Sequence, residues 1–171
     1  MKIISKINFL SIFFFLSIFL VSNCYSQEKV KIYDPTANAS EQIKKAVNSA
    51  QQQHKNILIQ IGGNWCPWCL KLHHFIQDHQ ELDSIIKADY VFIRINYSKE
   101  NKNPRVMQQL QYPQRFGFPV LVVLDQHGKL LHTQDTGYLE KGDSYDEANI
   151  KRFLTLWNIK ALNPDTYKSK N

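Results

Sequence analysis

Apolar residues recur along this chain at two spacings, one typical of helices and one typical of strands. Within residues 38–53 they fall at i, i+3, i+4 and i+7, which predicts a helix. Residues 57–61 read Ile-Leu-Ile-Gln-Ile and precede two glycines, which predicts a short buried strand. The helical spacing returns at Cys66 and predicts a second helix that runs to about residue 80, or as far as residue 87.

The same two patterns continue through the second half of the chain. Further strands are predicted at 90–95, 120–124 and 129–133, and further helices at 104–111 and 146–157. The first two strands of the chain, joined by a helix, should be parallel, because such crossovers are right-handed, and the last two should form a hairpin. This order predicts an α/β fold in which helices cover both faces of a central mixed sheet.

The first 26 residues differ from the rest. Two lysines precede an apolar run at 9–21, and a short polar stretch follows, which is the arrangement of a secretory signal peptide. The apolar run is shorter than the roughly 20 residues of a membrane-spanning helix, so an uncleaved membrane anchor is the weaker alternative. Cleavage after Ser26 would leave one domain at 27–158 and a polar tail at 159–171, in a protein that is periplasmic or secreted.

Cys24 lies just before this cleavage site, and two fates are open to it. A lipoprotein signal would place a small residue before the cysteine, and Asn23 fits that pattern poorly. We therefore expect Cys24 to be removed with the leader, with a lipid anchor at Cys24 as the alternative.

Removal of the leader would change the net charge of the chain only slightly. The formal net charge is +6, and loss of residues 1–26 would leave 19 basic and 15 acidic residues. The densest basic stretches, 99–105 and 168–170, do not interleave aromatic residues as a nucleic-acid surface would. We expect a monomer that does not bind nucleic acid.

The candidate chemistry lies in residues 62–74, which read GGNWCPWCLKLHH. A disulfide between Cys66 and Cys69 would close a very short loop and add little stability, so a purely structural role explains the pair badly. Cys66 lies between a strand end and a helix start, where unpaired N–H groups and the helix dipole favour the thiolate. Cys69 lies one turn later and deeper, so an exposed first sulfur could attack a substrate and the second could resolve the mixed disulfide.

The motif Trp65-Cys66-Pro67-Trp68-Cys69 after a buried strand, with Gly117-Phe118-Pro119 some fifty residues later, resembles the thioredoxin superfamily. The resemblance implies a three-layer α/β/α sandwich, a cis peptide bond before Pro119, and docking of an extended substrate segment on the backbone of Phe118. It also implies a thiol–disulfide oxidoreductase with no organic cofactor. Its partners would be protein substrates with thiols or disulfides and a redox partner protein that could be membrane-bound.

The residues around the motif suggest a docking surface and one departure from the family. Trp65, Pro67 and Trp68 could shield the disulfide and offer an apolar surface to substrates, although simple packing explains the tryptophans equally well. Thioredoxins have a buried aspartate six residues before the first cysteine, and here that residue is Gln60. Deprotonation of Cys69 would then rely on water, a histidine or the substrate.

Three functions remain open beside reduction of substrate disulfides, which we favour. The protein could instead be a disulfide oxidase or isomerase of the same fold. Cys66, Cys69 and His73 could bind a metal ion through sulfur and nitrogen. A redox-inert binding module would use the fold only as a scaffold.

Overall fold

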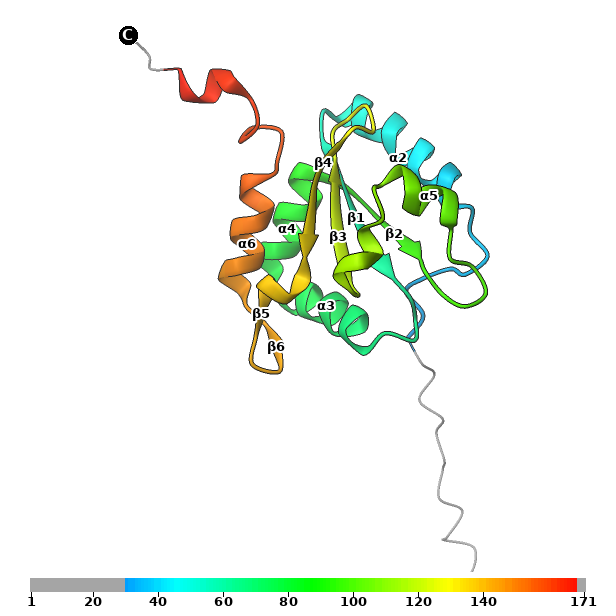
Figure 1. Ribbon diagram of the computed structural model, residues 1–171. Helices are drawn as coiled ribbons and strands as arrows, with labels where there is room; N and C mark the ends of the chain where they lie inside the picture. The colour runs from blue at the N-terminus through cyan, green and yellow to red at the C-terminus, as the bar shows by residue number, and fades with distance from the viewer. Residues whose placement is uncertain (1–29, 169–171) are drawn as a thin grey trace, which may run out of the picture.

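Four strands form the centre of the molecule in the computed structural model, which describes residues 30–168 (Figure 1). They are β1 (Asn56–Gly62), β2 (Tyr90–Asn96), β3 (Val120–Leu124) and β4 (Leu130–Asp135). Their order across the sheet is β2-β1-β3-β4; β1 and β2 are parallel, whereas β3 is antiparallel to β1 and to β4. The predicted mixed sheet, parallel pair and hairpin are confirmed.

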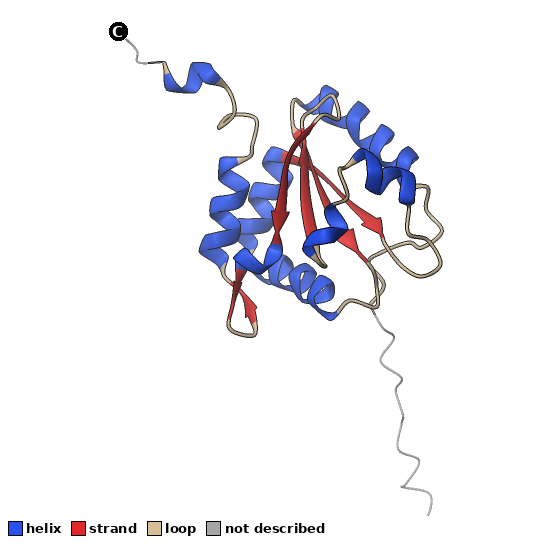
Figure 2. Ribbon diagram, viewed as in Figure 1, coloured by secondary structure: helices blue, strands red, loops and turns tan. Residues whose placement is uncertain are grey.

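Helices cover both faces of this sheet, as Figure 2 shows. One layer contains α2 (Ala39–Gln53) and α5 (Pro104–Gln109). The other contains α3 (Pro67–Asp78), α4 (Gln80–Asp89) and α6 (Glu147–Leu156). The fold is therefore the α/β/α sandwich that the sequence predicted.

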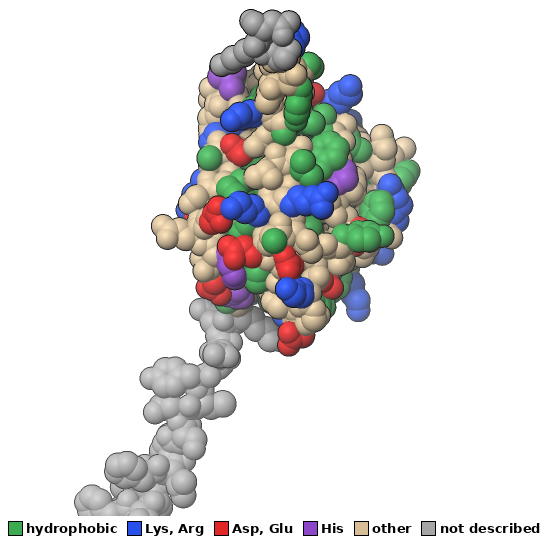
Figure 3. Space-filling model, turned by 90° about the vertical axis from the view of Figure 1, so that its left-hand side faces the viewer, with side chains coloured by type: hydrophobic (Ala, Val, Ile, Leu, Met, Phe, Trp, Pro, Cys, Tyr) green, Lys and Arg blue, Asp and Glu red, His purple; other side chains and the backbone are tan. Residues whose placement is uncertain are grey.

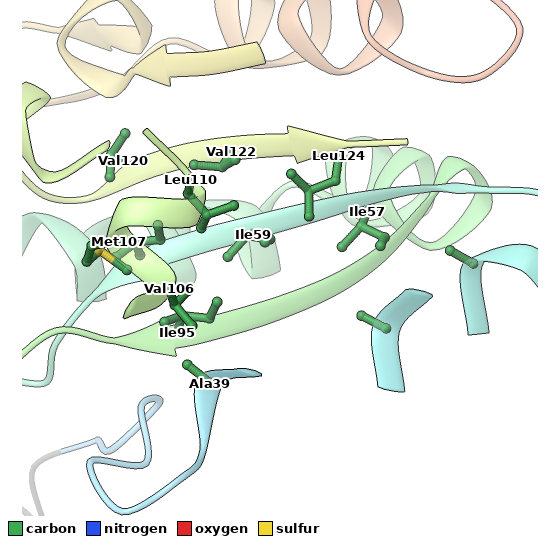
Figure 4. Packing of buried hydrophobic residues seen from close by; sticks show 13 residues of the cluster. Ala39, Ile57, Ile59, Ile95, Val106, Met107, Leu110, Val120, Val122 and Leu124 are labelled. Atoms are coloured by element: carbon green, nitrogen blue, oxygen red, sulfur yellow. The ribbon is translucent and has the colours of Figure 1, made fainter. Parts of the chain in front are cut away.

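The two hydrophobic layers follow from the period of two along each strand. Ile57, Ile59 and Ile61 of β1 face α2 and α5, and Figure 4 shows this layer with the alternate residues of β3 packed beside them. Leu58 points the other way, toward α3 and α4. Every residue of β1 is buried, because strands cover both of its edges and helices cover both of its faces.

One predicted helix is divided in the structure. The helix expected from residue 66 to 80 or 87 ends at Asp78, and α4 begins at Gln80 after His79, whose backbone is extended. His79 Nδ1 lies 2.7 Å from the carbonyl oxygen of Phe75, the acceptor that the His79 N–H would use in a continuous helix. The imidazole also stacks on the Phe75 ring, so this side chain accounts for the break.

Several short elements were not predicted. A 3₁₀ turn at Thr136–Leu139 and a two-stranded ribbon, β5 (Glu140–Lys141) and β6 (Ser144–Tyr145), connect β4 to α6. A further 3₁₀ turn at Pro164–Tyr167 lies in the segment that we expected to be a polar tail. These elements are too short to leave a hydrophobic period in the sequence.

Residues 1–26 and Cys24 lie outside the described residues, so the predicted leader stays a prediction. No helix within residues 30–168 is long and apolar enough to cross a bilayer. On the face shown in Figure 3, acidic and basic side chains are interspersed. The described residues also form the surface ion pairs Lys151–Glu81 and Lys141–Asp146.

The packing beneath α3 generates a stability prediction. Leu72 is fully buried between α3 and the sheet, so Leu72→Ala should lower the free energy of unfolding by about 2–5 kcal/mol. Leu156 of α6 is 53% exposed, and Leu156→Ala should change it by less than about 0.5 kcal/mol. Urea unfolding of both variants measures the difference, and equal losses would contradict this description of the core.

Candidate active site

Cys66 and Cys69 lie shortly after the end of β1, at the start of α3. Pro67 is the first residue of α3, where a missing N–H costs nothing, and Cys66 is the N-cap. The two cysteines form a disulfide, with their Cα atoms 5.3 Å apart. Cys66 Sγ also accepts a hydrogen bond from the backbone N–H of Cys69, at 3.1 Å. The helix start therefore directs its backbone donors at the first sulfur, as predicted.

The burial of Cys66 differs from our expectation. The sequence predicted an exposed first sulfur, but Cys66 is 3% exposed in the disulfide state and Cys69 is fully buried. The reason is a small hydrophobic cluster around the pair, which contains Tyr33 and is flanked by Ile32, Trp68 and Phe118. The small remaining exposure of the pair belongs to Cys66 rather than to Cys69.

The turn at Phe118-Pro119 lies against this cluster. Its peptide bond is cis, as the resemblance implied, and Pro119 is buried. Thr136 Oγ1 donates a hydrogen bond to the Pro119 carbonyl at 2.6 Å, which fixes the turn to the loop after β4. Neither the N–H nor the C=O of Phe118 has a backbone hydrogen-bond partner within residues 30–168. An extended segment could therefore pair with them.

An aromatic surface continues from this turn. Trp65 is 56% exposed, and its ring meets that of Phe118 edge-on at 5.5 Å between centroids. Its Nε1 donates to the backbone carbonyl of Tyr97 at 2.8 Å, and the Tyr97 ring lies 4.8 Å from that of Phe118. A side chain at Gly63 would collide with Trp65 Nε1, so this glycine lets the indole lie close to the backbone.

A groove of about 600 Å³ opens beside Trp65 and Tyr97. The loop after β2 forms its far wall with Ser98, Lys99 and Glu100. This loop contains most of residues 99–105, one of the two densest basic stretches of the sequence. The loop therefore shares this groove with Trp65, the residue before Cys66.

Trp68 and Pro67, the other residues of the predicted docking surface, differ from each other. Pro67 is exposed. Trp68 is half-buried, its ring meets Tyr145 edge-on at 5.4 Å, and its carbonyl accepts from Tyr145 Oη at 3.2 Å. Lys71 Nζ lies 4.3 Å from the centroid of the Trp68 ring. Trp68 therefore fastens α3 to the β5–β6 ribbon.

Gln60 lies behind the pair, in the place that the resemblance assigns to a carboxylate. It is fully buried, and its Nε2 donates to the carbonyl of Cys69 at 3.1 Å. Its Oε1 accepts from Arg94 Nε at 3.4 Å. Both ends of the amide are thus engaged, and Arg94 forms no salt bridge within the described part of the chain.

His73 turns toward Arg94 rather than toward the sulfurs. Its Nδ1 lies 3.0 Å from Arg94 Nη2. Burial lowers the pKa of His73, and the charges of Arg94 and His74 lower it further, so the imidazole is neutral at pH 7 and accepts from the guanidinium. Within residues 30–168, Cys66, Cys69 and His73 do not form a group placed to hold a metal ion, and the metal-site alternative loses its support.

Three residues near the pair were missed from the sequence. Asn64 Oδ1 accepts from the backbone N–H groups of Ile32 and Tyr33, and its Nδ2 donates to the Tyr33 carbonyl at 2.8 Å. This clamp places Tyr33 in the cluster with the cysteines. Tyr97 directly follows β2, and its position at the carboxyl end of a strand parallel to β1 could have revealed it. No pattern in residues 30–37 marked Tyr33.

The sequence profile of the thioredoxin-like domain matches residues 43–148, which include the cysteine pair, Gln60 and the cis-proline turn. The chain belongs to the thioredoxin-like domain family. A related sequence is the disulfide bond reductase DsbH of Chlamydia pneumoniae, which is 29% identical over 77% of this chain and 83% of its own length.

Two solved structures extend the comparison. The disulphide isomerase of Xylella fastidiosa Temecula1 is 27% identical, with a TM-score of 0.65 over 74% of this chain and 95% of that one. A thioredoxin from Thermus thermophilus has a TM-score of 0.50 at 13% identity, over 84% of this chain and 99% of that one, and shows the shared fold alone. This member of the thioredoxin-like family is a thiol–disulfide oxidoreductase, which excludes the redox-inert scaffold.

The environment of His73 predicts a dependence of stability on pH. The unfolded chain protonates His73 near pH 6.5, whereas the lowered pKa keeps the folded imidazole neutral to lower pH. The unfolded state therefore binds more protons, and the free energy of unfolding should fall as the pH drops below about 6.5 and through the folded pKa.

His73→Gln should flatten this decline, while His127→Gln, in an exposed turn, should leave it unchanged. Urea unfolding at intervals between neutral and mildly acidic pH measures both. A His73→Gln protein that declines as steeply as the parent would contradict the assigned environment.

Proposed function

We propose that this protein is an exported reductase of protein disulfides, with Cys66 as the nucleophile and Cys69 as the resolving thiol. The observation that carries the proposal is the hydrogen bond from the Cys69 N–H to Cys66 Sγ at the start of α3. Thiols at helix N-termini have pKa values lowered to about 3.5–7.5, so a reduced Cys66 would be largely thiolate at neutral pH. The first turn of α3 contains no acidic residue that would oppose this effect.

The reaction takes two exchanges. The Cys66 thiolate attacks one sulfur of the substrate disulfide, the substrate S–S bond breaks, and the first substrate thiolate leaves. The Cys69 thiolate then attacks Cys66 Sγ, the mixed disulfide breaks, and the second substrate thiolate leaves. Two electrons have passed to the substrate, both of its thiolates take protons from water, and the Cys66–Cys69 disulfide is formed.

Substrates would dock beside the disulfide on three features. The unpaired N–H and C=O of Phe118 can accept an extended segment as an added strand. Trp65 and Pro67 supply exposed apolar surface next to Cys66. Trp68 and Pro119 would support the site without contacting the substrate, since both are packed against neighbouring elements.

The direction of electron flow rests on the relatives. The Chlamydia pneumoniae relative is named as a disulfide bond reductase, and its similarity spans most of both chains. The Xylella fastidiosa relative is a disulphide isomerase, which keeps isomerisation as the second candidate. An exported reductase would need a dithiol donor protein, and in an oxidising compartment a membrane-bound donor is the route we expect. Intact mass of the exported protein would test cleavage after Ser26 against lipidation at Cys24.

Single cysteine variants should separate the two sulfurs. Cys66→Ser should abolish insulin reduction by a dithiol-recycled enzyme, because the attacking thiolate is gone. Cys69→Ser should instead accumulate covalent mixed disulfides with substrate proteins, because resolution is blocked. Non-reducing gel electrophoresis checks the adducts; adducts formed by Cys66→Ser and not by Cys69→Ser would reverse the assigned roles.

The reduction potential of the pair should decide the direction. A reductase should equilibrate with glutathione near the thioredoxin value of about −270 mV, whereas a strong oxidant would lie near about −120 mV. A value near about −180 mV, as for protein disulfide isomerase, would favour the second candidate. Quantifying the reduced fraction across a series of glutathione buffers measures it.

A further inference from the structure

Tyr33 carries a buried hydroxyl group that nothing in the described structure uses. The residue is 3% exposed, and its Oη has no hydrogen-bond partner within residues 30–168. A buried polar atom without a partner is uncommon and points to a ligand, a water or a second state of the molecule that satisfies it. The neighbouring atoms indicate which of these applies.

The nearest reactive group is the inner sulfur. A Cβ atom built on Gly62 would lie 2.4 Å from Cys69 Sγ and 2.8 Å from Tyr33 Oη. Tyr33 Oη and Cys69 Sγ are therefore no farther apart than the sum of those two distances. A side chain at position 62 would fill the space next to both atoms. Gly62 leaves the two groups open to each other.

Tyr33 is also held firmly in this place. Asn64, two residues before Cys66, binds the backbone of Ile32 and Tyr33 through three hydrogen bonds. The phenol ring packs in the same small cluster as both cysteines. The element that presents the hydroxyl is thus fixed to the loop that presents the disulfide.

The surroundings favour a negative charge on Cys69. The titratable or charged groups grouped behind it are Tyr33, Arg94 on β2 and His73 on α3. His73 is neutral, and no Asp or Glu is among the buried residues of the described chain. The Gln60 amide is already engaged, since it donates to the Cys69 carbonyl and accepts from Arg94.

We propose that Tyr33 donates a hydrogen bond to Cys69 Sγ when the disulfide is reduced, and so stabilises the Cys69 thiolate. The proposal rests on the dithiol function described above. When a donor thiolate attacks Cys66 Sγ, the Cys66–Cys69 bond breaks and its electron pair passes to Cys69 Sγ. The phenol donates its hydrogen bond to the sulfur that carries this charge and keeps its own proton. The thiolate later takes a proton from water or attacks Cys66 again.

The phenol is suited to donate and not to ionise. Burial raises the pKa of Tyr33 above its ordinary value, an effect that the charge of Arg94 and the polar side chain of Gln60 oppose only in part. The hydroxyl therefore keeps its proton throughout the cycle. This role replaces proton transfer by a buried carboxylate with fixed hydrogen bonding by a neutral donor.

Tyr33→Phe in the full chain tests the proposal, because it removes only the hydroxyl. In a Cys66→Ser background, the pKa of Cys69 should rise by about one unit when Tyr33 is replaced, which is a tenfold change in the ionisation constant. In the two-cysteine protein, at a pH above the pKa of Cys69, the equilibrium with glutathione should shift about tenfold toward the disulfide, which corresponds to about 30 mV for this couple. Thiolate absorbance and redox titration give the two readings.

The matched control is Tyr90→Phe. Tyr90 is equally buried, but its hydroxyl donates to the carbonyl of Leu154 at 2.6 Å, at the α6 side of the sheet. Tyr90→Phe should lower the free energy of unfolding and leave the pKa of Cys69 unchanged. Tyr33→Phe should show the reverse, since its hydroxyl has no partner to lose in the oxidised state.

A second variant guards against local rearrangement. Asn64→Ala releases the clamp and should raise the pKa of Cys69 in the same direction as Tyr33→Phe. An unchanged pKa of Cys69 in Tyr33→Phe would overturn the proposal. Failure of the parent protein to reduce insulin would instead refute the proposed function, and the titration of Cys69 would still report on Tyr33.

Discussion

The site depends on the burial of β1. This strand has neighbours on both edges and helices on both faces, so its carboxyl end is fixed relative to every layer of the molecule. α3 starts a few residues beyond that end, with Cys66 as its cap. The direction of the helix start, and with it the backbone donors at the first sulfur, is therefore set by the packing of the sheet rather than by the loop alone.

The second sulfur lies in an environment unlike the one that the family resemblance implies. Within residues 30–168, a neutral amide, an arginine that forms no salt bridge and a phenol without a hydrogen-bond partner stand in place of the buried acid. Burial lowers the pKa of Arg94, and the half-buried guanidinium remains charged at neutral pH. An acid would exchange protons with Cys69, whereas these groups can only stabilise negative charge on it.

Much of the fold could be predicted from the sequence, because hydrophobic residues recur at regular spacings along the core strands and long helices. The buried strand at 57–61, the hairpin after Val120 and the amphipathic α6 all lie where those periods predict. The break at His79 could not be predicted from the sequence, because it arises from one side chain that binds the backbone carbonyl oxygen of Phe75. The ribbon of β5 and β6 has two residues in each strand and no period to detect.

The site divides in the same way. The two cysteines, Gln60 and Phe118-Pro119 form a motif with fixed spacing and could be found along the chain. Tyr33 and Tyr97 reach the pair only through tertiary contacts, from a segment without any pattern and from the end of a neighbouring strand. The burial of Cys66 had the same origin, since the residues that cover it come from separate elements.

The Asn64 clamp also determines what covers the inner sulfur. Ile32 and Tyr33 pack against the two cysteines, and the clamp ties this segment to the loop that carries the disulfide. Displacement of the segment that contains Ile32 and Tyr33 would expose the sulfur of Cys69 to water, while the sheet and its helices would stay intact. Three hydrogen bonds from a single side chain thus hold in place the segment that shields the inner sulfur from water.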